Sequence, residues 1–477
     1  MEARTHRNSL PLAVDLDGTV IATDLLWEAL VRAFKANPFV LFLVPIWLLG
    51  GKARLKQELA KRVAIDASLI PYRAEFIDYL RAEKAQGRKL VLATGSPKIF
   101  ADAVAAHLGI FDQVMATEGD TNLTSSRKRD ALVGAFGDGG FDYAGNSRED
   151  IKVFDAASNV IVVAPDRVAS RYQAANGTDL FSAPKQTIKT ILKLLRVHQW
   201  AKNVLIAVPA VLANDLDRMA TVVAIVFAFI AFSMLASAIY IVNDLFDLDA
   251  DRRHKTKRNR PLAAGTVSIA SGIMIAAALI AVSAAVSLYL PLFFQLVLAG
   301  YAVLTTAYTA ALKRMLLIDV LALAGLYTVR VIAGAAATQI EVSFWLLAFS
   351  VFFFLSLALV KRYVELDTTA ETDKGKISGR GYRVTDRQVL AESGIAATFS
   401  SVLVLALYID SDQVKMLYER PYLIWLLCPI VLYLSLRIWV LARRGEMHED
   451  PVVFILSDWR SQFMVLAGAL LVAAAAF

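Results

Sequence analysis

The stretch from Thr221 to Pro261 reads TVVAIVFAFIAFSMLASAIYIVNDLFDLDADRRHKTKRNRP. Its first 21 residues carry no charged side chain, and about 20 apolar residues are what a helix needs to cross a bilayer. The apolar run ends in Asn243, Asp244, Asp247 and Asp251, and a basic cluster follows directly. This stretch therefore predicts a membrane helix that carries a charged functional site at one end.

The rest of the chain divides at about residue 200. The protein has 477 residues, of which 57% are hydrophobic and 19% charged, against about 25% charged in a typical soluble domain. Residues 1–198 have charges every few positions, whereas apolar runs recur beyond Asn203. The predicted spans are 199–213, 221–241, 267–288, 291–311, 317–337, 343–360, 394–409, 422–441 and 459–477. We expect nine transmembrane helices.

The basic residues predict the topology. The net charge is +7, but the cations cluster in loops after the even-numbered spans, so nucleic-acid binding is not expected. These cations include Lys313 and Arg314, Lys361 to Arg387 with Lys374 and Lys376, and Arg443 and Arg444. The positive-inside rule then predicts a multi-pass inner-membrane protein with a cytoplasmic N-terminus and Phe477 on the opposite side. The only cysteine, Cys428, excludes an intrachain disulfide framework and a Cys-based zinc site.

The first half of the chain alternates strand and helix patterns. Strands are predicted at Leu12–Val14, Lys89–Ala93, Val114–Ala116, Tyr143–Ala144 and Val160–Val163. This alternation indicates an α/β Rossmann-like parallel sheet with ligands at the carboxyl ends of its strands. The expected domains are a soluble domain over 1–178 with a helical cap at about 24–86, a linker over 179–198, and a membrane domain over 199–477.

Within the insertion, Pro38–Gly50 has no charged residue. It is too short to span a bilayer. Two interpretations stay open: a buried cap helix, or an interfacial helix that rests the soluble domain on the membrane.

Asp15 and Asp17 stand two residues apart directly after the first strand, followed by Gly18 and Thr19. Two such carboxylates can share a Mg²⁺ and a phosphate. The first would attack phosphorus, and the second would protonate the leaving oxygen and later activate water. An Asx turn that caps a helix is the structural alternative.

This motif and the residues after it resemble the haloacid dehalogenase (HAD) superfamily, over about residues 10–170. The resemblance implies that Thr94, or Ser96 two residues later, holds the phosphate and that Lys128 neutralises it. Asn146 and Asp150 match the acidic metal motif, although Asn146 stands where many members have Asp. The helical insertion matches the cap of such enzymes.

On a helix, Asn243, Asp244, Asp247 and Asp251 would share one face. Oxygen ligands that converge there suit Mg²⁺ bridged to substrate phosphates. The alternative is that acidic residues mark a solvated helix end, which would apply to Asp249 and in part to Asp251.

This motif, with Lys257, Arg258, Arg260 and Pro261 after it, resembles the UbiA superfamily of intramembrane prenyltransferases. Members that act on aromatic rings carry a second Asp-rich motif, for which this chain offers only Asp319, with Tyr308 and Lys313 just before it. The chain is more similar to the branch that transfers phosphoribose to a polyprenyl phosphate, the decaprenyl-phosphate phosphoribosyltransferase type. The residues that carry this similarity are Arg196, His198, Gln199, Trp200, Lys202, Asn203, Leu317, Asp319, Val329, Arg330, Gly334, Lys361, Arg362, Tyr363 and Glu365.

The resemblance implies a bifunctional enzyme. The membrane domain would use Mg²⁺, phosphoribosyl pyrophosphate and a polyprenyl phosphate lipid, and the HAD domain would remove the 5-phosphate of the product. Lys202, Lys257, Arg260, Lys361 and Arg362 can supply cations for the donor, and Arg330 would pair with Asp319 or meet the lipid phosphate. A UbiA-type prenyltransferase with an aromatic acceptor and a HAD domain without catalytic activity are the alternatives. Homo-oligomerisation stays open.

Overall fold

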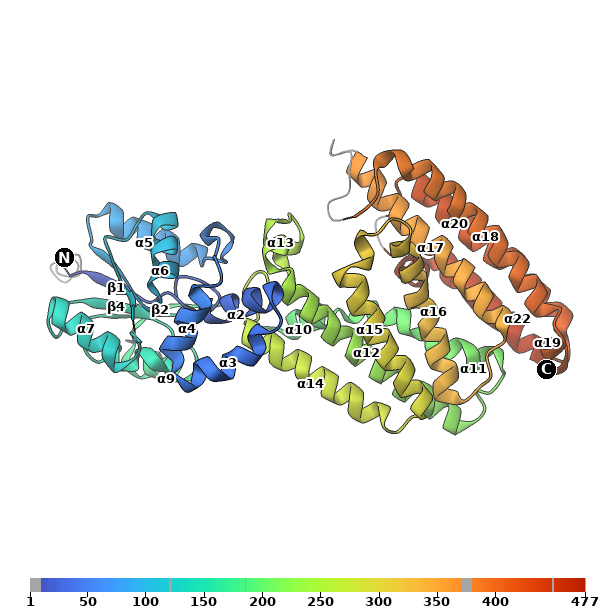
Figure 1. Ribbon diagram of the computed structural model, residues 1–477, viewed down its shortest axis with the longest axis horizontal. Helices are drawn as coiled ribbons and strands as arrows, with labels where there is room; N and C mark the ends of the chain where they lie inside the picture. Colours follow the sequence, from blue (N-terminus) through green and yellow to red (C-terminus); the bar gives the residue numbers. More distant parts are fainter. Residues whose placement is uncertain (1–9, 120–121, 185, 371–379, 448–449, 477) are drawn as a thin grey trace. The chain divides into compact units, whose positions relative to one another are not determined.

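The structure is a computed structural model that describes residues 10–119, 122–184, 186–370, 380–447 and 450–476 (Figure 1). Lys374, Lys376 and Phe477, which the topology prediction uses, lie outside these residues. The chain forms two compact units. One consists of Met1–Leu194 with Ile241–Ile275, and the other of Leu195–Tyr240 with Ala276–Phe477.

The first unit is built on a six-stranded parallel sheet in the order β3-β2-β1-β4-β5-β6. The strands are β1 (Leu12–Val14), β2 (Leu90–Pro97), β3 (Gln113–Thr117), β4 (Asp142–Gly145), β5 (Val160–Val163) and β6 (Asp179–Phe181). All five predicted strands are present, and the predicted α/β class is confirmed. The sixth strand lies where a linker was expected. Since β6 is a largely exposed edge strand of three residues, it leaves almost no hydrophobic pattern in the sequence.

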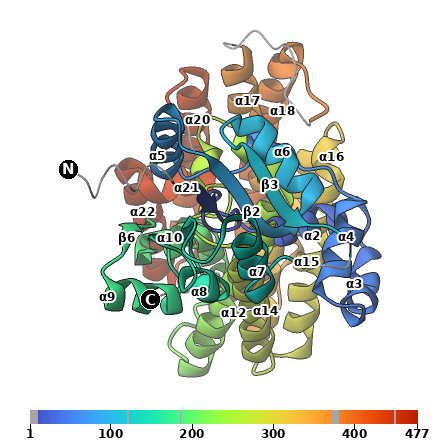
Figure 2. The same ribbon diagram turned by 90° about the vertical axis from the view of Figure 1, so that its left-hand side faces the viewer.

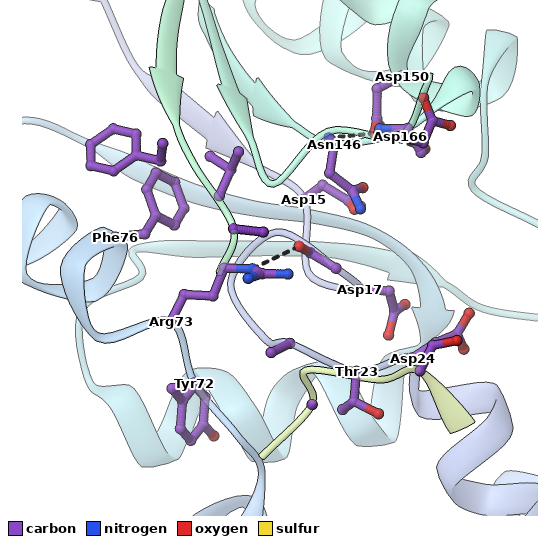
Figure 3. Close-up of a pocket in the computed structure, with 18 of the residues that line it drawn as sticks. Asp15, Asp17, Thr23, Asp24, Tyr72, Arg73, Phe76, Asn146, Asp150 and Asp166 are labelled. Atoms are coloured by element: carbon purple, nitrogen blue, oxygen red, sulfur yellow. Dashed lines mark hydrogen bonds between the residues drawn. The ribbon is translucent and has the colours of Figure 1, made fainter. Parts of the chain in front are cut away.

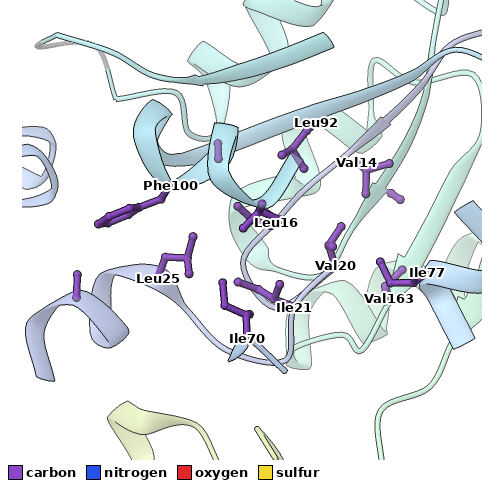
Figure 4. Packing of buried hydrophobic residues seen from close by; sticks show 14 of the residues in the cluster. Val14, Leu16, Val20, Ile21, Leu25, Ile70, Ile77, Leu92, Phe100 and Val163 are labelled. Atoms are coloured by element: carbon purple, nitrogen blue, oxygen red, sulfur yellow. The ribbon is translucent and has the colours of Figure 1, made fainter. Parts of the chain in front are cut away.

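Helices cover both faces of this sheet (Figure 2). Helices α5 (Ala74–Ala85) and α6 (Lys98–Leu108) pack on the face that Val14 and Leu92 share (Figure 4). The opposite face, on which Ala13 lies, packs against α7 (Ser126–Phe136), α8 (Ile151–Phe154) and α9 (Arg167–Asn176). Because β1 pairs with β2 on one side and β4 on the other, whatever follows Val14 lies at the centre of the carboxyl edge.

The insertion after β1 is helical, as expected. It contains α2 (Leu25–Ala36), α3 (Val40–Leu49), α4 (Lys52–Ala60) and the 3₁₀ turn η1 (Ala67–Leu69). In α3 only Val40 and Trp47 are buried, whereas Phe42 is 73% exposed and Leu49 is 90% exposed. The interpretation of α3 as a buried cap helix is therefore wrong. The interfacial interpretation stays a prediction.

The remaining long helices are apolar enough to cross a membrane. They are α12 (Met219–Phe246), α14 (Ile269–Ser287), α15 (Leu292–Ala310), α16 (Ile318–Thr338), α17 (Phe344–Ala370), α18 (Arg387–Ile409), α20 (Leu427–Arg443) and α22 (Trp459–Ala476). In the part of the chain that is described, eight helices meet the length and hydropathy of a membrane span. Shorter helices, α10 (Ile188–Leu195), α13 (Leu248–Arg253), α19 (Asp412–Leu417) and α21 (Pro451–Ser457), connect them.

The predicted span at 199–213 is not a membrane-length helix. Residues Val197–Ala207 form the 3₁₀ helix η3, and the short helix α11 (Val208–Leu212) follows with Pro209 in its first turn. A run of 15 residues reaches only about 22 Å as a helix, short of the roughly 30 Å of a bilayer core. Within η3, Lys202 and Asn203 are buried polar residues, so these side chains face protein and not lipid.

Candidate active sites

Asp15 lies at the centre of the sheet's carboxyl edge, where Lys128 links it to Asp150 and Tyr143. Its backbone N–H donates to Ala144 O at 2.9 Å, which holds it against β4. Lys128 Nζ donates to Asp15 Oδ1 at 2.7 Å, to Asp150 Oδ1 at 3.1 Å and to the Tyr143 hydroxyl at 2.9 Å. Residues from β1, α7 and the β4–α8 turn thus meet although they are far apart in sequence.

Two carboxylates at this edge, Asp15 and Asp150, share one ammonium group, that of Lys128. Burial raises the pKa of Asp15 to about 7, and the neighbouring charges of Asp150 and Asp17 add to the effect that Lys128 opposes. Burial, and then the charge of Asp24, raises the pKa of Asp17 to about 6. Desolvated carboxylates with too little positive charge around them favour a bound cation, and their oxygen ligands, with the amide of Asn146, suit Mg²⁺.

Asp17 is held on the other side of the same loop. It accepts from Leu25 N at 2.9 Å through Oδ1 and from the Ser96 hydroxyl through Oδ2. Thr94 is fully buried and its hydroxyl accepts from Ser96 N. Of the two hydroxyls predicted to hold phosphate, the one that contacts an acidic side chain is therefore that of Ser96. Between the two aspartates and Asn146 the backbone turns at Gly18, which has φ +79°, and a Cβ there would lie 2.1 Å from Asn146 Nδ2.

These groups line a cavity of about 1190 Å³ (Figure 3). The cap adds Asp24, Lys56 and Arg73 to the lining, and Arg73 Nε donates to Gly18 O at 2.9 Å. None of these cap residues was predicted, because single charged residues in a helical insertion have no motif spacing. The cavity is large enough to admit a phosphorylated substrate beside Asp15.

Lys128→Met tests whether the buried charges depend on this lysine. The substitution leaves Asp15 and Asp150 without their cation, and we expect it to destabilise the first unit by about 3 kcal/mol. Scanning fluorimetry of the full-length protein in detergent measures this as a lower melting temperature. The control is Lys98→Met, since Lys98 pairs with Glu118 on the exposed surface, and it should not shift the melting temperature. Equal shifts would contradict the buried network.

The Asp-rich motif forms a second acidic group. Asp244 and Asp251 are buried, and both accept from Arg260 Nη1, at 2.9 and 2.7 Å. The expectation of one continuous helix is wrong, because α12 ends at Phe246 and Asp247 is the N-cap of α13 with φ −101°. Asp247 N still donates to Asn243 O, and Asp251 N to Asp247 O. These i to i−4 hydrogen bonds therefore continue across the break, and Asp244 and Asp251 lie close enough to share Arg260.

This group fits Mg²⁺ by its chemistry and spacing. Across the described ranges, no three His, Cys, Asp or Glu side chains gather into a metal cluster. Mg²⁺ is commonly held by one or two carboxylates and completed by water and substrate phosphates. Asp244 and Asp251 accept from the same nitrogen of Arg260, so their carboxylates are close enough to bind one Mg²⁺. Asn243 and Asp247 are half-buried beside them, and Lys257 is exposed.

In the second unit, Lys202 and Lys361 meet at a carboxylate that the sequence did not indicate. Both ammonium groups donate to Asp450 Oδ2, at 2.8 and 2.9 Å. The Tyr327 hydroxyl donates to the same carboxylate at 2.9 Å. Asp450 was missed because it lies outside every quoted motif, although the contacts join η3, α16 and α17 through it.

Asp319 does not pair with Arg330, which corrects one of the two predicted partners. Arg362 and Arg380 contact Asp319 Oδ2 at 2.7 and 3.4 Å, and the Tyr382 hydroxyl donates to its other oxygen. Asp319 and Arg362 are both fully buried. Asp319 is thus enclosed by cations, which leaves it poorly placed for a metal.

Arg330 lies in a different setting. Its Nε donates to Asn203 Oδ1 at 2.9 Å, and its Nη2 donates to the Tyr301 hydroxyl at 3.3 Å. The aromatic rings of Phe232, Tyr301 and Tyr327 surround the guanidinium. The other predicted binding residues are more dispersed. Arg196 lies over the Tyr240 ring, Tyr308 accepts from Arg380, and Lys313 is half-buried in the turn η5 (Leu312–Arg314).

Two protein families match the segments of the chain that carry these charged groups. The UbiA prenyltransferase family matches residues 204–458, and the haloacid dehalogenase-like hydrolase family matches residues 12–152. The chain belongs to the UbiA prenyltransferase family. It carries an N-terminal HAD-like hydrolase domain, as the motifs predicted, and is a multi-pass membrane protein.

Three relatives show how much of this chain is similar to other proteins. An uncharacterized protein y4nM of Sinorhizobium fredii is 39% identical over 98% of this chain and 90% of its own length. Nodulation protein NoeC of Azorhizobium caulinodans is 31% identical over 60% of this chain and 94% of its own. Decaprenyl-phosphate phosphoribosyltransferase of Mycobacterium tuberculosis is 36% identical over 40% of this chain and 64% of its own.

Proposed function

We propose that this UbiA-family protein transfers 5-phosphoribose from phosphoribosyl pyrophosphate to a polyprenyl phosphate, and that its HAD domain then removes the 5-phosphate. The product would be a polyprenyl-phosphoryl pentose, a cell-envelope precursor. Support comes from the similarity to a decaprenyl-phosphate phosphoribosyltransferase and from the charged groups of the two units. We further propose the inner membrane as its location.

The burial of Asp319 is the observation that favours this proposal over the alternative of an aromatic prenyltransferase. UbiA-family members that act on aromatic rings carry a second Asp-rich motif, and Asp319 is the residue of this chain that corresponds to it. Here three groups, Arg362, Arg380 and Tyr382, already satisfy its carboxylate. This favours a reaction that uses one acidic motif and several cations over one that needs two metal sites.

The transfer requires a bond exchange at C1 of ribose. An oxygen of the lipid phosphate attacks C1, the bond from C1 to the diphosphate oxygen breaks, and diphosphate leaves with the electron pair. Asp244 and Asp251 would hold Mg²⁺, which would supply positive charge to the leaving diphosphate. Arg260 is fixed by Asp244 and Asp251, so its remaining N–H groups are oriented to bind phosphate oxygens. Stabilising the leaving group is the main catalytic contribution that such preorganised donors make.

The phosphatase step uses the carboxyl edge of the sheet. An oxygen of Asp15 attacks the 5-phosphate, the bond from phosphorus to the ribose oxygen breaks, and Asp17 gives that oxygen its proton. Water then attacks phosphorus with Asp17 as base, which releases phosphate and restores Asp15. A pKa of about 6 suits Asp17 to both roles near neutral pH, and Lys128 compensates the charge of Asp15 and phosphate.

The donor assay tests the proposal. The purified protein is incubated with Mg²⁺, polyprenyl phosphate and phosphoribosyl pyrophosphate labelled in the ribose ring, and the lipid phase is counted. Label in the lipid supports the proposed transfer. A parallel reaction with a prenyl diphosphate and an aromatic acid tests the alternative. Product in that reaction alone would overturn the proposal.

We propose that the basic loops face the cytoplasm, which predicts which loops are accessible from outside the cell. In a Cys428→Ala background, Arg258→Cys lies in the exposed basic segment before α14 and Tyr289→Cys in the turn between α14 and α15. A membrane-impermeant maleimide should label Tyr289→Cys in intact cells and Arg258→Cys only after lysis. The reverse pattern would contradict the orientation.

A further inference from the structure

Asp450 joins two lysines that are far apart in sequence. Lys202 in η3 and Lys361 in α17 donate to the same oxygen, Oδ2, at 2.8 and 2.9 Å. Tyr327 in α16 donates to both oxygens, and Val452 N donates to Oδ1 at 3.2 Å. The carboxylate is therefore fixed by backbone and side chains, and the two ammonium groups are fixed by the carboxylate.

The charges of this cluster do not balance. Two ammonium groups share one carboxylate. The other carboxylate whose charge acts on Lys361, that of Glu365, is itself paired with Arg362 and Arg380. The Arg330 guanidinium, which lies near the same Tyr327 ring, has hydrogen-bond partners that are neutral. The side chains of Lys202 and Asp450 are each only 8% exposed. Buried charges without compensation are costly, so a cluster with excess positive charge is favourable when an anion joins it.

One side of the cluster is accessible. Lys361 is 31% exposed, unlike Lys202 and Asp450, so it reaches an accessible side of the cluster. Each ammonium has three N–H donors, of which the hydrogen bond to Asp450 uses one. Burial alone would raise the pKa of Asp450, but the charges of Lys361 and Lys202 outweigh it and hold that pKa well below its usual range. The carboxylate therefore stays ionised and keeps both lysines in place.

We propose that Asp450 is a positioning residue that holds Lys202 and Lys361 as a paired clamp for a phosphoryl group of a substrate. This rests on the proposed function and deepens it, since both substrates of that reaction carry phosphoryl groups. Asp450 itself touches no substrate. Its role is to keep two cations a fixed distance apart, where they would otherwise repel each other.

Asp450→Asn tests the clamp, because it preserves shape and removes the charge that pairs the lysines. We expect the KM of the clamped substrate to rise about 30-fold or more, as when one partner of a buried charge pair is removed. The KM of phosphoribosyl pyrophosphate and that of polyprenyl phosphate are measured separately, and the one that rises identifies the source of the phosphoryl group. Asp450→Glu keeps the charge and should recover most of the loss.

Asp458→Asn is the matched control. Asp458 lies eight residues later, pairs with Arg437 at 2.6 Å and accepts from Ser461 N at 2.8 Å, so it has a similar structural role without the two lysines. We expect unchanged KM values in this variant. If Asp450→Asn changes only the melting temperature or kcat, or changes both KM values no more than the control does, Asp450 is a structural residue and the clamp is wrong.

Binding of inorganic pyrophosphate, measured by calorimetry, separates this inference from the proposed function. If the wild type transfers no ribose, the proposed function fails, and weaker pyrophosphate binding by Asp450→Asn than by Asp458→Asn still supports the clamp. Equal binding by the two variants overturns it. Tighter binding by Asp450→Asn also overturns it, because the carboxylate would then merely compete with the anion.

Discussion

Asp251→Asn is expected to lower the rate of ribosyl transfer by about 10² to 10³-fold. Asp251 and Asp244 together fix Arg260 and offer the carboxylate oxygens of the proposed metal site. The amide keeps the shape of the side chain but removes the charge that both functions need. Initial rates of label entry into the lipid phase, at saturating Mg²⁺ and donor, measure the effect.

Asp249→Asn is the control for this prediction. Asp249 lies on the same short helix, α13, but is not one of the two carboxylates bound to Arg260. The Asp249 side chain is 42% exposed and pairs with Arg32 rather than with Arg260, so we expect the transfer rate of this variant to stay within about threefold of the wild type. Asp247→Ala should abolish transfer as well, since Asp247 lies at the break between the helices. Undiminished transfer by Asp247→Ala and Asp251→Asn would remove this motif from the reaction.

Asp15→Asn is expected to make the lipid product retain its 5-phosphate. The substitution keeps the shape of the side chain and removes the nucleophile, so dephosphorylation should fall by about 10⁴-fold or more, as for other catalytic nucleophiles. Ribosyl transfer should continue, because it uses the other acidic group. Mass spectrometry of the extracted lipid distinguishes the two products by the mass of one phosphate.

Two further variants sharpen this test. Asp102→Asn alters an exposed aspartate on α6 and should give the dephosphorylated wild-type lipid. Asn146→Asp adds a carboxylate beside Gly18 and Asp15 (Figure 3), so we expect activity to be kept, or raised at low Mg²⁺. Identical lipids from wild type and Asp15→Asn would refute the phosphatase assignment and favour a docking role for the HAD domain.

The sequence predicted what depends on local order along the chain. A hydrophobic run that ends in Asp15 identifies a buried parallel strand, and the carboxyl ends of such strands meet at one edge. That reasoning predicted the position of Asp15, and the resemblance to the HAD superfamily implied that Asp150 joins it. The Asp-rich motif was likewise visible, since Asp244 and Asp251 are two helical turns apart.

Contacts that depend on tertiary packing were not predictable in this way. Asp319 and Arg330 are eleven residues apart on one helix, yet the partners of Asp319 come from Arg362, Arg380 and Tyr382. Asp450 has no motif around it, and only the packing of η3 and α17 reveals its two lysines. The exposure of α3 was equally hidden, because apolar residues predict burial without saying whether protein or lipid covers them.

A double-label experiment tests the central claim most directly. Phosphoribosyl pyrophosphate carrying ¹⁴C in the ribose ring and ³²P in the 5-phosphate is incubated with polyprenyl phosphate, Mg²⁺ and the wild-type protein. We expect ¹⁴C to enter the lipid phase while ³²P is released as inorganic phosphate, and we expect Asp15→Asn to retain both labels in the lipid. Absence of ¹⁴C from the lipid would contradict the transferase, and equal ¹⁴C and ³²P in wild-type lipid would contradict the phosphatase.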